Sequence, residues 1–267
     1  MSQTSEKFRV EWLAADQARD AGLEEPTDVT AFKDISYGEF GDWNLLDLYI
    51  PKAVTTLDAA MKKHPVIISV HGGAFVYGQK ETYKFYLMSL AQRGFAVVNF
   101  NYRLAPEFKF PAALEDTDAV LHWVMDNAAK SWYDSHAKIN PPENFKPKAV
   151  ALNCGLFDLT EDRNKQADIV VDLLGDHWEE CCDFLNVEDF LTKEFPPVFV
   201  MTGEYDFLKS QNQHMAETLE KLGLPHVFKH YGTQDNKEIS HVFHVNMKLP
   251  LAHACNDAEC EFFKGFI

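Results

Sequence analysis

The sequence has few basic residues, no long apolar run and no cysteine pattern of the secreted kind. Its 25 Lys and Arg residues face 41 Asp and Glu residues, which gives a formal net charge of −16. Nucleic acids and anionic membranes repel such a surface, so we expect neither as a partner. No stretch is apolar over the roughly 18–20 residues that a membrane helix needs, and residues 1–20 contain no apolar core of the signal-peptide type.

Disulfides and metal centres are also not indicated. The five cysteines are Cys154, Cys181, Cys182, Cys255 and Cys260. Disulfide frameworks use even numbers of cysteines at regular spacings, so we expect free thiols and a cytoplasmic location. The pairs His177/Cys181 and His241/His244 have no third ligand at a suitable spacing, and we expect no metal and no cofactor.

What the sequence does contain is an alternation of short apolar segments with helical patterns. Residues 6–20 have a partial helical periodicity, and residues 29–37 and 43–50 read as two strands of an antiparallel hairpin. Apolar runs typical of buried strands follow at 66–70, 95–102, 148–154, 197–202 and 226–231, and helical patterns at 83–93, 110–130, 210–222 and 249–266. This order predicts an α/β fold with a mostly parallel central sheet flanked by helices.

Chemistry is expected outside the carboxyl ends of the strands, where α/β sheets bind their ligands. The run His71-Gly72-Gly73-Ala74 follows one strand directly. Glycines have no Cβ, so a reacting oxygen can approach their backbone N–H groups as closely as an oxyanion hole requires. A plain strand-to-helix turn is the alternative interpretation.

Two further turns carry an acid and a histidine. Asp206 follows the strand at 197–202, where a carboxylate can orient an imidazole, and His241 follows the last strand, where it can act as a general base. The order acid, then histidine is that of α/β-hydrolase triads. Three alternatives stay open: Asp206 as the N-cap of the helix that begins near Ser210, Glu204 as the orienting acid, and His241 as an ordinary loop histidine.

Several motifs in sequence order resemble the hormone-sensitive-lipase-like branch of the α/β-hydrolases. They are His71-Gly72-Gly73-Ala74, Tyr102-Arg103-Leu104-Ala105-Pro106-Glu107, Phe110-Pro111-Ala112-Ala113-Leu114-Glu115-Asp116, Gly203-Glu204-Tyr205-Asp206-Phe207-Leu208 and His241-Val242-Phe243. The resemblance extends over roughly residues 45–130 and 148–267. It implies hydrolysis of small acyl esters, with Gly72, Gly73 and Ala74 as oxyanion donors, Asp206 as acid and His241 as base. Ala74 and Val242 stand where the family has glycine.

The Gly-x-Ser-x-Gly nucleophile elbow of that family is absent from this sequence. None of the nine serines has glycine two residues before and two after it, nor does any cysteine. The elbow belongs between about Lys130 and Lys148, where a strand, elbow and helix would need about 30 residues. Only the polar run 131–147 stands there. The nucleophile is therefore unknown, and we expect that the sequence omits a strand-helix unit.

Two alternatives to an omitted unit stay open. The chain could be a deletion that keeps the scaffold as a catalytically dead, small-ligand-binding protein. Alternatively, Ser131, Ser135 or Cys154 could replace the missing serine. The two serines lack the strained turn that exposes a nucleophile, and Cys154 ends a strand that would lie one position away, where a buried cysteine is usually structural.

Domain organisation is expected to be simple. We predict a single α/β-hydrolase domain over residues 1–267, with helical cap elements at approximately 1–28 and 156–196. In that interpretation the cap forms the acyl pocket over the site. The alternatives for the second segment are an extension of the core, or a homodimer face that uses its large apolar side chains.

Overall fold

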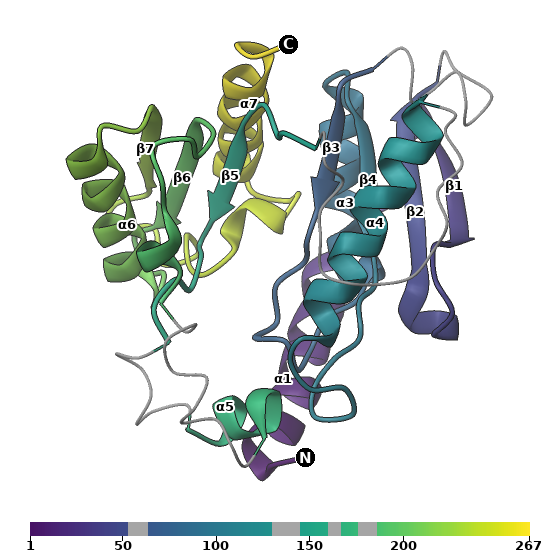
Figure 1. The fold of residues 1–267 in the computed structure, drawn as a ribbon. Coiled ribbons are helices and arrows are strands. Elements are labelled where there is room, and N and C mark those ends of the chain that lie inside the picture. Colours follow the sequence, from purple (N-terminus) through teal and green to yellow (C-terminus); the bar gives the residue numbers. More distant parts are fainter. Residues whose placement is uncertain (53–63, 130–144, 160–166, 176–185) are drawn as a thin grey trace. The chain divides into compact units, whose positions relative to one another are not determined.

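The computed structural model describes residues 1–52, 64–129, 145–159, 167–175 and 186–267 (Figure 1). The chain groups into two compact units, and each is described by itself. The first comprises Met1–Phe145 with Asp168–Asp176, and the second comprises Lys146–Ala167 with His177–Ile267. The expectation of a single domain stays a prediction.

The first unit is built on a four-stranded sheet in the order β1-β2-β4-β3. Its strands are β1 (Val29–Ser36), β2 (Leu45–Pro51), β3 (Val66–Ser69) and β4 (Ala96–Phe100). β1 and β2 form the predicted antiparallel hairpin, with a register shift between Phe32 and Ile35. β2 pairs antiparallel with β4, and β3 pairs parallel with β4.

Helices cover both faces of this sheet, which explains why its inner strands are largely apolar, with Asp47 and Asn99 as buried polar exceptions. Alternate residues of β2, among them Leu46 and Leu48, are fully buried and share one core cluster with Val98 of β4. α4 (Ala112–Ala129) contributes Val120 and Val124 to the same cluster. α3 (Lys80–Gln92) packs against β2 and β4, and Figure 1 shows α3 and α4 on opposite faces of the sheet.

The second unit holds a parallel sheet in the order β5-β6-β7. Its strands are β5 (Val150–Asn153), β6 (Val198–Gly203) and β7 (His226–Tyr231). β6 is buried along its whole length, and its side chains alternate between two helices. Val200 packs with Met215 of α6 (Lys209–Leu222), and Met201 packs with Cys255 of α7 (Pro250–Lys264).

One helix from each of the two predicted cap segments lies in the first unit, and the two helices pack on each other. They are α1 (Gln3–Asp20) and α5 (Ala167–Leu174). The Ser2 hydroxyl donates to Asp172 at 2.7 Å, and Phe8 packs against a cluster that contains Ile169 and Leu173. The other described residues of the second segment, 156–159 and 186–196, belong to the second unit, so a cap over the site stays a prediction.

The expected strands and helices are found, with shifted ends. α1 begins three residues before the predicted start at residue 6, and α3 begins at Lys80 rather than Tyr83. Within residues 156–196, 160–166 and 176–185 lie outside the described part of the chain, and the short helix η3 spans Val187–Phe190. None of the described helices is long and apolar enough to cross a bilayer.

The strand-helix unit that we expect to be omitted would fall in a part of the chain outside the described residues. This part comprises residues 130–144. Direct pairing of the strands at Phe95 and Val150 would have excluded an omitted strand. Among the described strands, however, β4 pairs with β2 and β3, and β5 pairs with β6. β3 and β5 are consequently edge strands of the two described sheets.

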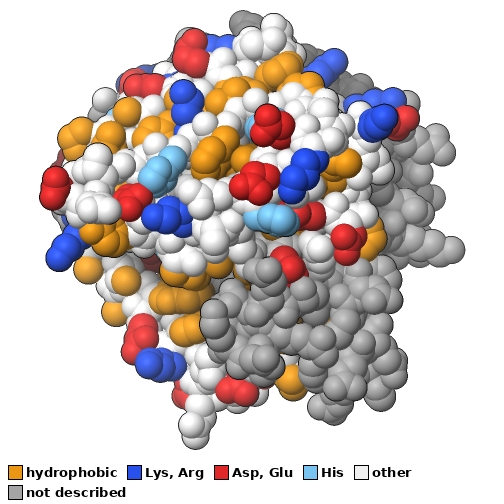
Figure 2. All heavy atoms as spheres, turned by 90° about the vertical axis from the view of Figure 1, so that its left-hand side faces the viewer, with side chains coloured by type: hydrophobic (Ala, Val, Ile, Leu, Met, Phe, Trp, Pro, Cys, Tyr) orange, Lys and Arg blue, Asp and Glu red, His pale blue; other side chains and the backbone are white. Residues whose placement is uncertain are grey.

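One side of the molecule, that of α6 and β7, is drawn in Figure 2. On the part drawn in colour, basic, acidic and histidine side chains are interspersed with hydrophobic ones. No area there carries basic side chains alone, as binding to a phosphate backbone would require.

Candidate catalytic site

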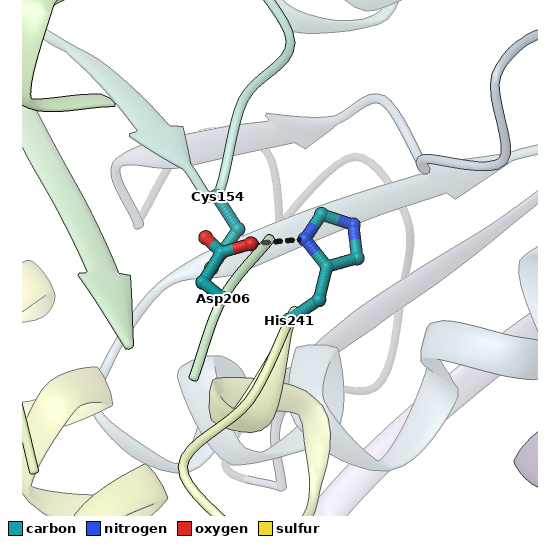
Figure 3. A group of neighbouring side chains, drawn as sticks. All are labelled: Cys154, Asp206 and His241. Carbon is teal, nitrogen blue, oxygen red and sulfur yellow. Dashed lines mark hydrogen bonds and ion pairs between the residues drawn. The ribbon is translucent and has the colours of Figure 1, made fainter. Parts of the chain in front are cut away.

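The second unit brings Asp206 and His241 together (Figure 3). Nδ1 of His241 lies 2.8 Å from Oδ1 of Asp206, and the Asp206 side chain is fully buried. A carboxylate bound to Nδ1–H fixes the imidazole tautomer and leaves Nε2 as the basic nitrogen. In Figure 3 the second ring nitrogen points away from the carboxylate.

A close backbone approach places the two turns side by side. The amide of Tyr205 donates to the carbonyl of Ile239 at 2.9 Å, and Tyr205 forms a parallel bridge with Ser240. A Cβ on Gly203 would lie 2.6 Å from the Ile239 carbonyl oxygen, so the contact needs glycine at that position. Gly203 ends β6, and Asp206 follows three residues later.

Hydrogen bonds keep Asp206 ionised despite its burial. The Thr202 hydroxyl donates to Oδ2 at 2.8 Å, and the Leu208 amide donates to Oδ1 at 2.9 Å. Burial by itself raises the pKa of Asp206, but the hydrogen bond and charge interaction with His241, together with these two donors, outweigh burial and lower it. The capping alternative is wrong for this structure: the N-cap of α6 is Leu208, with no side-chain cap hydrogen bond, and the amide that Asp206 receives precedes the helix.

The other carboxylate of this turn has different partners. Glu204 Oε2 lies 2.8 Å from Nε2 of His230 and 3.3 Å from Nζ of Lys209. Glu204 therefore pairs with His230 of β7 and Lys209 of α6. The alternative in which it orients His241 is wrong for this structure. His244, buried in η4 (Phe243–Val245), is not part of the described group around His241.

Cys154 lies beside Asp206 and His241, a position that the sequence did not predict. Cys154, Asp206 and His241 each offer one possible ligand atom, and these three atoms all lie within 4.8 Å of one another (Figure 3). Cys154 follows β5 directly and is 3% exposed. Its burial and the nearby Asp206 carboxylate raise the pKa of the thiol. Because the thiolate is the reactive form, this cysteine is unsuited to replace the serine. Ser131 and Ser135 lie outside the described residues.

Phe207 is a second residue that sequence reasoning missed. Its ring centroid lies 4.3 Å from that of His241, and the side chain is 65% exposed. An exposed aromatic ring beside the imidazole offers contact area to an apolar part of a ligand. The signal was available, since Phe207 directly follows the acid in the sequence.

The predicted oxyanion residues lie in the first unit, in the turn after β3. Among the described residues, the N–H groups of Gly73 and Ala74 have no acceptor, and the Gly72 N–H donates to the Tyr83 hydroxyl at 3.3 Å. The Gly73 carbonyl closes the turn by accepting from the amide of Val76 at 3.0 Å. Donors for an anionic oxygen are thus present in this turn.

Both positions where the family motif has glycine retain a conformation that favours glycine. Ala74 and Val242 each have a φ of 51°. A side chain in this left-handed region costs about 1–2 kcal/mol, and a β-branched residue is seldom found there. Ala74 and Val242 thus hold a backbone conformation that glycine adopts most readily.

Parts of this chain are similar to known proteins. A model of the BD-FAE family matches residues 46–141. Tuliposide A-converting enzyme 2, chloroplastic, of Tulipa gesneriana is 35% identical over 96 residues, which are 33% of this chain and 24% of that protein. Probable carboxylesterase 3 of Arabidopsis thaliana is 31% identical over 133 residues, covering 48% of this chain and 41% of its own.

The aligned region thus spans about a quarter of the first of these relatives. Among solved structures, esterase B from Lactobacillus rhamnosis in an inhibited form superposes with a TM-score of 0.83 at 22% sequence identity. The superposition covers 97% of this chain and 95% of that one. The predicted fold is confirmed: the chain has the α/β-hydrolase fold, and residues 46–141 are a segment that matches the BD-FAE family.

Proposed function

We propose that this chain is a carboxylic ester hydrolase that acts on small acyl esters by a serine mechanism. The hydrogen bond between His241 Nδ1 and buried Asp206 carries the proposal, because a ligand-binding protein has no need of that pair. The esterase names of several relatives and structural neighbours support the same reaction class.

In the proposed mechanism a serine from the omitted segment attacks the ester carbonyl carbon. His241 Nε2 takes the serine proton and passes it to the departing alkoxide, which leaves as an alcohol. Asp206 holds the imidazole tautomer and stabilises the imidazolium that forms. The N–H groups of Gly72, Gly73 and Ala74 are the proposed oxyanion donors, and that of Gly72 must first release the Tyr83 hydroxyl. Water, activated by His241, then attacks the acyl-enzyme and releases the acid.

The second candidate is a small-ligand-binding protein on the same scaffold with a dead nucleophile. The absence of Gly-x-Ser-x-Gly from the sequence favours it. The two candidates differ in one property: only the hydrolase forms a covalent intermediate.

Covalent labelling combined with intact mass separates the candidates. The native protein is weighed, treated with a fluorophosphonate and assayed for a burst of p-nitrophenol from p-nitrophenyl acetate. A mass above that of the 267 residues by roughly 30 residues, labelling, and a burst lost in His241→Ala are the expected results. His214→Ala is the matched control, since His214 is a largely exposed histidine paired with Glu188.

The hydrolase proposal fails if the mass equals that of the 267-residue chain and neither labelling nor a burst is found. Saturable binding of an ester without turnover would then favour the binding protein.

We also propose a cytoplasmic location, with no nucleic-acid or membrane partner, and an acyl pocket under the two cap segments. The net charge of −16 and the mixed surface of Figure 2 support the absence of nucleic acid. A homodimer stays an alternative role for the second cap segment, where Phe190 is 55% exposed and Trp178 lies outside the described residues.

A further inference from the structure

We propose that Cys154, Asp206 and His241 form a binding site for a thiophilic divalent cation of the Zn²⁺ and Cd²⁺ class, and that the ion separates His241 from Asp206 when it binds. The ion would act as an inhibitor and not as a cofactor. The inference goes beyond the proposed hydrolase, because binding requires no nucleophile and can be measured without substrate.

The three side chains already lie at the separation of a metal site. They come from the turns after three neighbouring strands, β5, β6 and β7, and converge in Figure 3. Their ligand atoms lie within 4.8 Å of one another, and a tetrahedral ion with bonds of about 2.0–2.3 Å holds its ligands roughly 3.5 Å apart. The 2.8 Å contact of His241 Nδ1 with Asp206 must open by under about 1 Å.

Charge balance favours a divalent ion at this depth. Asp206 and Cys154 are 5% and 3% exposed, so any charge left there without a partner is costly. A thiolate and a carboxylate together neutralise a divalent cation, and the imidazole adds a neutral ligand. The His241 side chain is 30% exposed, so one of the three ligands is in contact with solvent.

Binding must release a proton. Cys154 loses its thiol proton to solvent when the metal–sulfur bond forms. The proton of His241 moves from Nδ1 to Nε2, so that the Nδ1 lone pair can bind the ion. Each ion therefore replaces one bound proton and breaks the hydrogen bond to Asp206.

The donor set selects the class of ion. Sδ of Met201 lies 3.8 Å from Sγ of Cys154, and Met201 is fully buried. Thiolate and thioether sulfur prefer soft ions, whereas Mg²⁺ and Ca²⁺ require oxygen ligands. Zn²⁺ and Cd²⁺ should therefore bind, and Mg²⁺ and Ca²⁺ should not compete with them.

Cobalt spectroscopy tests the site directly. The experiment uses full-length protein with Cys181→Ser and Cys182→Ser, because those thiols lie outside the described residues and could bind metal themselves. Titration with Co²⁺ should give one thiolate-to-cobalt charge-transfer band per chain, displaced by Zn²⁺. Cys154→Ser should abolish the band, whereas the matched change Cys260→Ser, at another buried cysteine that forms no disulfide, should retain it.

Two further readouts address the imidazole. Zn²⁺ calorimetry in buffers of different ionisation enthalpy should report one proton released per ion. Proton NMR should show loss of the downfield Nδ1–H signal of His241 when Zn²⁺ binds. His241→Gln should weaken Zn²⁺ binding at least tenfold, with His214→Gln as the control.

The proposal is overturned if the charge-transfer band persists in folded Cys154→Ser. It is equally overturned if Zn²⁺ binds His241→Gln as tightly as the parent protein, a comparison that remains available should Cys154→Ser not fold. Failure of the hydrolase proposal would leave all these readouts unchanged, so the two failures are distinguishable.

Discussion

The ring of His71 lies flat against the ring of Tyr102, with centroids 4.1 Å apart and an interplanar angle of 15°. The Tyr102 hydroxyl donates to the His71 carbonyl at 2.8 Å, so the pair ties the strand end before the diglycine turn to the segment after β4. His71 is 3% exposed, and its burial lowers the pKa of the imidazole to about 4.

This burial predicts that acid destabilises the protein through His71. The unfolded chain binds the proton below pH 6.5 and the folded chain only below about pH 4, so the free energy of unfolding falls as the pH drops between these values. The loss from pH 7 to pH 4 should be about 3 kcal/mol. In His71→Gln, the free energy of unfolding measured with urea should fall by about 3 kcal/mol less between pH 7 and pH 4 than in the parent protein. In His214→Gln it should fall as much as in the parent protein. An unchanged slope in His71→Gln would contradict the prediction.

Neighbouring glycines of the turn should differ in their tolerance of a side chain. Gly73 has a φ of 121°, and its Cβ would lie 2.0 Å from the Tyr77 carbonyl oxygen. At Gly72 the nearest atom is the Tyr83 hydroxyl at 3.0 Å, the mobile end of a side chain. Gly73→Ala should therefore lower the free energy of unfolding by more than about 2 kcal/mol, and Gly72→Ala by under about 1 kcal/mol. Equal losses in urea unfolding would refute this distinction.

Val242 should reverse the usual order of alanine and glycine. Both replacements remove the valine side chain, but only glycine relieves the φ of 51°. Relief of about 1–2 kcal/mol exceeds the roughly 0.4–1 kcal/mol that glycine costs through the unfolded chain. Val242→Gly should therefore unfold at a higher urea concentration than Val242→Ala. Its free energy of unfolding should be higher by about 1 kcal/mol. The opposite order would show that Val242 is not strained.

Arg9 of α1 should stabilise the diglycine turn from a distance in the sequence. Its Nε donates to the Val76 carbonyl at 2.6 Å, and its guanidinium also binds Glu107. Hydrogen bonds from a charged group contribute about 1.5–3 kcal/mol, so Arg9→Ala should speed amide exchange at Val76 and Tyr77 by about tenfold or more.

Lys7→Ala serves as the matched control for Arg9→Ala. Lys7 lies on the same helix, is 66% exposed at its side chain and pairs only loosely with Glu11, at 3.8 Å. An exposed pair of this kind contributes little, so amide exchange in the turn should be unchanged. Equal exchange rates in both variants would show that Arg9 does not hold the turn.

Much of the architecture could be predicted from the sequence because strands covered on both faces leave a clear signal. The run at 198–201 is uniformly apolar since α6 and α7 enclose β6. The ends of helices were less predictable. α1 begins early because Ser2 caps it by accepting from the Ser5 amide, and a cap of one side chain leaves no periodic pattern.

The sequence by itself determined the α/β order and the turns in which the acid and the histidine stand, since both follow from local patterns of apolar residues and glycine. Only the tertiary structure decided that Asp206, and not Glu204, meets His241, because the answer depends on His230 and Lys209 binding Glu204. It also placed Cys154 against that pair. His241 is 35 residues from Asp206 in the chain, and Cys154 is 52 residues from it. These side chains meet only because three parallel strands align their carboxyl ends, and that alignment cannot be predicted from the spacing of the residues.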